Sequence, residues 1–307
     1  MEFNIKKILV PVDFTPASLN ALDTAIGMAK RHEAGILLLN VVETGGLSGY
    51  TSDGASMEES ILAMIHHSEQ ELQTIQHSVI ERFQVSCEVI AATGIVSAAI
   101  TKISAAHHAD IIVMGAHGTT GFRESFIGIN AFNVVKNATC PVLTVPSQKK
   151  WESFKKILFP VRPIPAAIEK YDFIRKIIRN NDATLKVLGL VENYDHDVEL
   201  IKDLASQLND KLKEDKVQAS VYFKVGENMA EEVLKMATIL DSDLIVVTTT
   251  LDASCNQCNV IGPFTKYVFN HAHFPVLSVK PSNADKPLNV MPQHLQSTFS
   301  QTVSKYN

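Results

Sequence analysis

The chain has 307 residues, of which 46% are hydrophobic and 20% are charged, and its formal net charge is −5. This composition is typical of a globular protein with room for two ordinary domains, and the absence of a basic cluster argues against nucleic acid or anionic lipid as a partner. No apolar run approaches the roughly 18 residues of a membrane-spanning helix, and the N-terminal sequence lacks the features of a signal peptide. We therefore expect a cytoplasmic protein without a membrane partner.

The first segments alternate between strand and helix patterns. Residues 6–17, KKILVPVDFTPA, begin with a continuous apolar run, which is typical of a strand buried on both faces. Residues 17–32 follow with a helical pattern, in which Ser18 is a possible cap. One stripe of this helix carries Leu19, Leu22, Ala25, Ile26 and Ala29.

The next segments continue the alternation. A second apolar run at 35–43 precedes a glycine-rich stretch at 43–56, which is either a lid or a slack linker, and then a long helical pattern at 56–83. A weaker strand at 85–94 and a short helical pattern at 96–109 come next.

The fourth strand, 109–115, runs into a loop with the spacing G-x2-G-x9-G, formed by Gly115, Gly118 and Gly128. Glycine permits positive φ and has no Cβ, so backbone N–H groups can converge on an anion. The helix expected over 129–137 would present its positive N-terminal end to the same place. The pattern therefore predicts a phosphate site that is neither a P-loop nor a G-x-G-x-x-G dinucleotide site.

After a fifth strand at 140–146 the whole pattern repeats. KKILVPVDFTPA returns as KKILFPVRPIPA at 155–166, and the other strands recur in the same order at 184–192, 219–227, 242–248 and 274–280. Strands that alternate with helices of this length predict an α/β fold with two tandem five-stranded, parallel, doubly wound domains. We expect domains at 1–147 and 154–281, followed by a polar tail at 282–307 without an assigned role.

These motifs together resemble the universal stress protein family in its tandem, two-domain bacterial type, with an adenine nucleotide alpha hydrolase-like fold. The similarity covers residues 5–146 and 154–280. It depends on ILVPVDFTPAS at the first strand, ADIIVMGAHG at the fourth, the glycine spacing, and CPVLTVP at the fifth. The resemblance implies a stress-response protein whose first domain binds ATP, with Mg²⁺ as a possible companion and no metal required for the fold.

The resemblance also implies which residues would form the ATP site. Asp13 would accept a hydrogen bond from the adenine, and Val41 would pack against the base. Met114 and the loop glycines would line the ribose and phosphates, while Gly128 and the backbone after it would hold the phosphate chain. The full set is Pro11, Val12, Asp13, Val41, Met114, Gly115, His117, Gly118, Gly128, Ile129 and Asn130.

One position departs from the family pattern. The family commonly has Ser or Thr after the last glycine, whereas this chain has Ile129, which offers an N–H but no hydroxyl. The loss of one donor would weaken phosphate binding by about 1.5 to 3 kcal/mol unless Asn130, Thr119 or Thr120 compensates.

The second copy lacks most of this site. Arg162 stands in the place of Asp13, Thr248 and Leu251 replace the first two glycines, and Pro263, which has no N–H, follows Gly262. We expect no ATP there. The second domain is instead expected to be a structural partner in a pseudo-dimer, with its seam between the strands at 141–146 and 275–280.

The four cysteines do not suggest a disulfide framework. Cys255 and Cys258 form a C-x-x-C pair, but His271 and His273 are expected roughly 13 Å away, at the far end of a helix. Plain loop cysteines are the default, with a redox pair or a zinc site as alternatives.

No motif for hydrolysis is present, so we expect no dedicated enzyme, although slow ATPase activity stays open. The alternative function is a nucleotide-free interaction module that acts through protein or small-molecule partners. The protein partners are unknown, and a homodimer stays open.

Overall fold

A computed structural model describes residues 3–44, 57–116, 127–191, 194–249 and 261–280. The first half of the chain contains β1 (Lys7–Pro11), α1 (Pro16–His32), β2 (Gly35–Val42), α2 (Met57–Phe83), β3 (Cys87–Thr93), α3 (Val96–Ala106), β4 (Ile111–Gly115), α4 (Ile129–Asn137) and β5 (Val142–Val145). The second half contains β6 (Lys156–Val161), the 3₁₀ helix η1 (Pro165–Ile168), α5 (Lys170–Asn181), β7 (Thr184–Val191), α6 (Tyr194–Glu214), β8 (Ala219–Val225), α7 (Met229–Ile239), β9 (Leu244–Thr248), α8 (Pro263–His271) and β10 (Val276–Val279).

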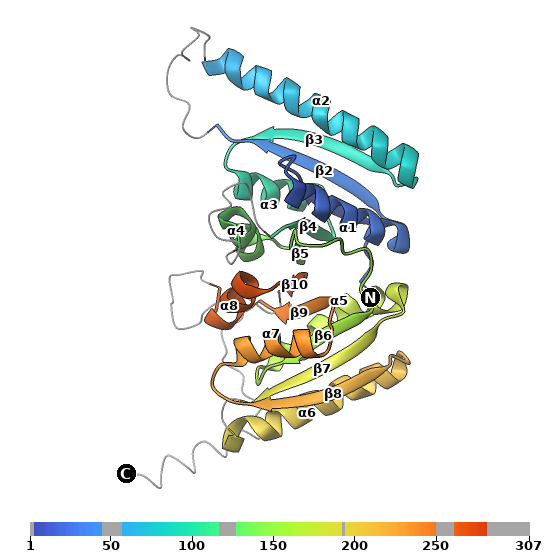
Figure 1. Ribbon diagram of the computed structural model, residues 1–307, viewed down its shortest axis with the longest axis vertical. Helices are drawn as coiled ribbons and strands as arrows, with labels where there is room; N and C mark the ends of the chain where they lie inside the picture. The colour runs from blue at the N-terminus through green and yellow to red at the C-terminus, as the bar shows by residue number, and fades with distance from the viewer. Residues whose placement is uncertain (1–2, 45–56, 117–126, 192–193, 250–260, 281–307) are drawn as a thin grey trace, which may run out of the picture.

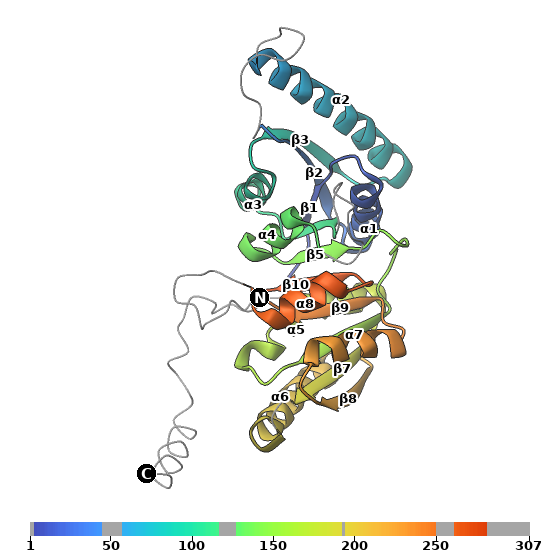
Figure 2. The ribbon, with the colours of Figure 1, turned by 60° about the vertical axis from the view of Figure 1, so that its left-hand side comes forward.

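The strands form one ten-stranded sheet in the order β3-β2-β1-β4-β5-β10-β9-β6-β7-β8, so the two halves mirror each other about its centre. Every pairing within a half is parallel, as the apolar runs predict. The halves meet where β5 and β10 pair in antiparallel register, with Leu277 opposite Leu143. Figure 1 shows this pair at the middle of the molecule, and Figure 2 shows it from a second side. The predicted pseudo-dimer seam is confirmed.

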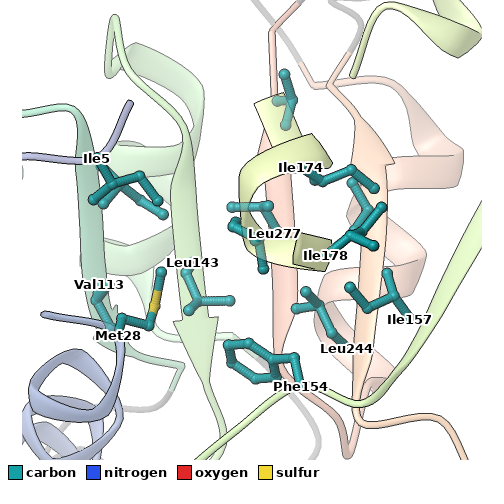
Figure 3. Close-up of a cluster of buried hydrophobic side chains, with 14 of the residues drawn as sticks. Ile5, Met28, Val113, Leu143, Phe154, Ile157, Ile174, Ile178, Leu244 and Leu277 are labelled. Carbon is teal, nitrogen blue, oxygen red and sulfur yellow. The ribbon is translucent and has the colours of Figure 1, made fainter. Parts of the chain in front are cut away.

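Helices cover both faces of the sheet. Buried side chains of α1, α2, α5 and α6 pack on one face, and those of α3, α4, α7 and α8 pack on the other. Each apolar cluster contains residues from both halves. Figure 3 shows one of them at the seam, where Leu143 and Leu277 lie near Phe154 from the connection between the halves. The two copies therefore share a continuous core.

The start of α1 differs from the sequence prediction. Its N-cap is Thr15, whose side chain accepts a hydrogen bond from the Ser18 N–H at 3.3 Å, and Pro16 occupies the first turn. Ser18 is therefore not the cap. Its hydroxyl donates back to the Thr15 carbonyl and accepts from the Asp13 N–H. Leu19, expected on the buried stripe, is 37% exposed.

Candidate nucleotide site

A cavity of about 420 Å³ lies at the carboxyl ends of β1, β2 and β4, between the first turns of α3 and α4. Its volume is within the range of small-molecule sites, and its place is where open parallel sheets bind ligands. His117 and Gly118 lie outside the described residues. The other predicted site residues all line the cavity: Pro11, Val12, Asp13, Val41, Met114, Gly115, Gly128, Ile129 and Asn130.

The turn after β1 orients Asp13. One carboxylate oxygen of Asp13 accepts hydrogen bonds from the Thr15 N–H at 3.2 Å and from the Thr15 hydroxyl at 2.5 Å. Phe14, between them, has a φ of 62°. Among the described residues the other Asp13 oxygen has no hydrogen-bond partner, so it is available to accept a donor from a ligand in the cavity.

Gly115 contributes through packing, not through an unusual backbone. A Cβ at this position would lie 3.2 Å from the Ala17 carbonyl oxygen, so glycine lets the end of β4 approach the first turn of α1. Neither Gly115 nor Gly128 has a positive φ, and φ of Gly128 is −59°. The positive φ that glycine permits is therefore not used at these two positions, and the missing Cβ is what matters at Gly115.

The first turn of α4 offers free backbone donors to the cavity. The Gly128 N–H donates to the Ala116 carbonyl at 2.8 Å, and the intrahelical hydrogen bonds begin with the Phe132 N–H. The N–H groups of residues 129–131 precede that bond, and no side chain caps them. This is the arrangement that binds anions at helix N-termini. Ile129 itself is 72% exposed, so its side chain does not close the cavity.

A polar pair that the sequence pattern did not reveal lies behind the cavity. Asn40 of β2 lines it and is buried, donates to the Val12 carbonyl at 2.7 Å, and accepts from the Ser68 hydroxyl of α2 at 2.7 Å. A polar residue in the apolar run of β2 was the signal that could have revealed it. Glu43, after β2, also lines the cavity and was missed.

The matching place in the second half is almost filled. Its cavity has a volume of only about 10 Å³. The guanidinium carbon of Arg162 lies 4.5 Å from the centre of the Phe264 ring. The Lys170 ammonium lies 4.1 Å from the centre of the Phe159 ring. Gly189 replaces Asn40, and the Phe223 ring lies where a Cβ of Gly189 would stand. The space left by the described residues is far smaller than the cavity of the first half.

The described cysteines are free and lie away from the cavity. Burial raises the pKa of Cys87 to about 11, and burial also raises the pKa of Cys140, whose thiol contacts the Ser104 hydroxyl. The C-x-x-C pair, Cys255 and Cys258, is outside the described residues. Among the described residues, no group of three or more His, Cys, Asp or Glu side chains could hold a metal ion. In the same part of the chain, no helix has the length and apolar character needed to cross a membrane.

Comparison with known proteins agrees with this architecture. A sequence model of the Universal stress protein family matches residues 4–146. A universal stress protein of Methanocaldococcus jannaschii is 32% identical over 145 residues, which cover 84% of that protein and 47% of this chain. The chain therefore belongs to the universal stress protein family.

Solved structures extend the likeness in fold to both halves. A universal stress protein from Archaeoglobus fulgidus has a TM-score of 0.74 at 18% identity and covers 92% of this chain and 99% of its own. A putative universal stress protein from Pseudomonas aeruginosa has a TM-score of 0.61 at 16% identity, with 91% of this chain and 95% of its own covered.

Proposed function

We propose that this protein is a cytoplasmic stress-response regulator whose first half binds ATP as a switch, while the second half is a structural partner. The observation that carries the proposal is the cavity of about 420 Å³ beside the free amides of α4. An open site next to a helix N-terminus suits a ligand with an apolar body and a phosphate chain.

The lining residues give ATP an orientation. The adenine would lie between Val41 and the end of β1, with its amino group toward the available oxygen of Asp13. The ribose would pass Met114 and Gly115, and the phosphates would reach the N–H groups at the start of α4. His117 and Gly118 would complete the loop around the phosphates. A Mg²⁺ ion that accompanied the nucleotide would bind the phosphate oxygens, and Glu43 supplies a further carboxylate on the cavity wall.

The residues of the second half support a single ATP site per chain, located in the first half. Arg162 stands in the place of the Asp13 carboxylate, and Lys170 and Phe264 line the small space that remains. Pro263 removes one of the N–H groups that the matching helix start in the first half retains. We propose no dedicated enzymatic activity for either half.

Nucleotide content tests the proposal. Purified protein is denatured, and the supernatant is analysed by chromatography with mass detection. About one ATP per chain is the expected result. A solved universal stress protein holds cAMP, so both nucleotides are then titrated by calorimetry into stripped protein. Absence of nucleotide together with absence of binding heat would overturn the proposal.

A matched pair of variants tests the role of the α4 amides. Ile129→Pro imitates Pro263 and removes one N–H. Gly128 has φ −59° and ψ 144°, close to the −57° and 152° of Gly262, so the backbone already accepts a following proline. We expect retained folding and an ATP affinity that is lower by about 10- to 150-fold, since a charged hydrogen bond is worth about 1.5 to 3 kcal/mol. Ile129→Ala keeps the amide and should bind like the unaltered protein.

A nucleotide-free interaction module is the second candidate. The observation that favours it is the exposed Ile129 side chain at the mouth of the cavity, where a partner could bury it. An empty protein without binding heat, in which Ile129→Pro changes nothing, would favour this function.

A further inference from the structure

A second cavity, with a volume of about 380 Å³, lies where α1 and the end of α2 face the connection between the two halves. Its wall includes Ile26, Lys30 and Arg31 from the last turns of α1, Phe83 from α2 and Trp151 from the connection. The candidate ATP cavity lies beside the first turn of α1, at the other end of that helix. The volume is within the range of small-molecule sites, so this cavity has room for a ligand of its own.

The connection between the halves is held along α1, beside which it runs in Figure 2. The Asn20 amide donates to two of its carbonyl groups, at 2.9 and 3.0 Å. The Lys150 ammonium pairs with the Asp23 carboxylate at 2.9 Å. A Cβ on Gly27 would lie only 2.8 Å from the Glu152 carbonyl oxygen, so glycine allows the chain to approach the helix this closely. The cavity wall is therefore formed by segments that are already fixed to one another.

Arg31 brings hydrogen-bond donors that lack an acceptor. Its Nε and Nη2 atoms are buried and have no partner among the described residues, although buried donors ordinarily have one. Burial lowers the pKa of Arg31 and the charge of the exposed Glu152 opposes this, and an arginine stays protonated in either case. The side chain as a whole is partly exposed and lines the cavity. A negative group in the cavity would thus supply an acceptor that this buried charge lacks.

Trp151 adds a second donor without an acceptor on the same cavity. Its side chain is 4% exposed, and its Nε1 atom has no partner among the described residues. The rings of Trp151 and Phe83, together with Ile26, form the apolar part of the wall. The Lys30 ammonium lies 4.8 Å from the centre of the Phe83 ring. The wall therefore combines aromatic surface with N–H donors and positive charge.

The charges on the wall favour a ligand with a single negative charge. Lys30, Arg31 and Lys150 line the cavity together with the acidic residues Asp23 and Glu152, so one positive charge is in excess among the described lining residues. Asp23 and Lys150 compensate each other in their ion pair. Further negative charges on a ligand would face Glu152 without a matching cation, which disfavours phosphorylated ligands.

We propose that this cavity binds a small aromatic monocarboxylate. The carboxylate would accept hydrogen bonds from Arg31 and Trp151, because a guanidinium group matches the planar geometry of a carboxylate. The aromatic ring of the ligand would pack against Phe83 and Ile26. The site shares no lining residue with the candidate ATP cavity, so it does not depend on ATP binding.

The fluorescence of Trp151 reports on this site directly, because it is the only tryptophan of the chain. Phenylacetate and benzoate are titrated into the full-length protein, and their neutral amides, phenylacetamide and benzamide, serve as controls of nearly the same shape. We expect a saturable change in fluorescence with at least one of the acids, one site per chain by calorimetry, and the same affinity in the presence of ATP. Binding of each amide should be weaker by about tenfold or more. No saturable binding of either acid, or equal binding of acid and amide, would overturn the proposal and leave water as the partner of these donors.

Three variants, measured by calorimetry, test the assigned contacts. Arg31→Met should lower the affinity for the acid by about 10- to 150-fold, and Trp151→Phe, which keeps a ring but removes the N–H, should lower it severalfold. Arg82→Met is the matched control, because Arg82 lies 5.5 Å from the centre of the Phe83 ring but does not line the cavity, and it should retain the affinity. An equal loss in Arg31→Met and Arg82→Met would contradict a direct contact. If Arg31→Met does not fold, Trp151→Phe and the comparison of acid with amide decide.

Discussion

Asn40 connects three elements around the candidate ATP cavity through its buried side-chain amide. Replacement by Leu would leave the Val12 carbonyl and the Ser68 hydroxyl without their partner, and each unsatisfied buried group costs about 1 to 3 kcal/mol. We expect Asn40→Leu to lower the free energy of unfolding by about 2 to 4 kcal/mol in urea titration. Ser68→Ala removes only one bond and should cost about 1 kcal/mol. Equal urea midpoints for the unaltered protein, Asn40→Leu and Ser68→Ala would show that the Asn40 amide does not stabilise the end of β1.

Ile129 tests how much the missing hydroxyl matters. Ile129→Thr restores a donor at the position where the family commonly has one, whereas Ile129→Val has nearly the same shape without the hydroxyl. We expect ATP affinity to increase about tenfold in the Thr variant and to remain unchanged in the Val variant, as calorimetric titration would measure. A gain in both variants would assign the effect to side-chain size.

At the scale of elements, α1 and α5 meet through His32. Asn180 of α5 contacts the His32 Nδ1 at 3.2 Å and donates to the Arg31 carbonyl at 2.9 Å. Burial, helped by the positive charges of Arg31, Lys176 and Lys6, lowers the pKa of His32 to about 4.

This lowered pKa gives the contact a pH dependence. Below pH 6.5 the unfolded chain takes up a proton on His32 while the folded protein does not, so stability is lost as the pH falls from about 6.5 to about 4. The loss from this residue is on the order of 3 kcal/mol, since one pKa unit corresponds to about 1.4 kcal/mol. His32→Gln should flatten this part of a plot of unfolding free energy against pH. A plot of unchanged slope would contradict the assignment to His32.

The sequence predicts some elements closely and others poorly, for physical reasons. The helix at 129–137 has the bounds of α4 because an apolar pattern begins directly after a glycine and needs no tertiary contact to specify it. The sequence offered Ser18 as a possible cap of α1, whereas the cap is Thr15, because both residue types can cap and only the backbone angles decide.

Burial of charge was less predictable still. Lys170 in a helical pattern is typical of a solvated face, yet closure of the second cavity buries it completely. Likewise, the cavity-lining role of Asn40 depends on contacts with β1 and α2 that lie far away in the chain. The candidate site was predictable where it follows strand ends and helix starts, and not where distant side chains support it.

At the scale of the whole molecule, the two copies form one packed body. The apolar clusters on both faces of the sheet contain residues of both halves. Leu277 is 1% exposed and pairs with Leu143 across the seam. We expect a single calorimetric unfolding transition, and Leu277→Ala should lower its stability by about 3 kcal/mol. Two separate transitions, of which Leu277→Ala moves only one, would show that the halves unfold independently.

The two copies differ in function because the same fold holds an open cavity of about 420 Å³ in one half and a space of only about 10 Å³ in the other, so we expect ATP in the first half alone. The most direct measurement is the stoichiometry of ATP binding to stripped full-length protein by isothermal titration calorimetry. We expect one ATP per chain. Two ATP per chain, or none, would contradict it.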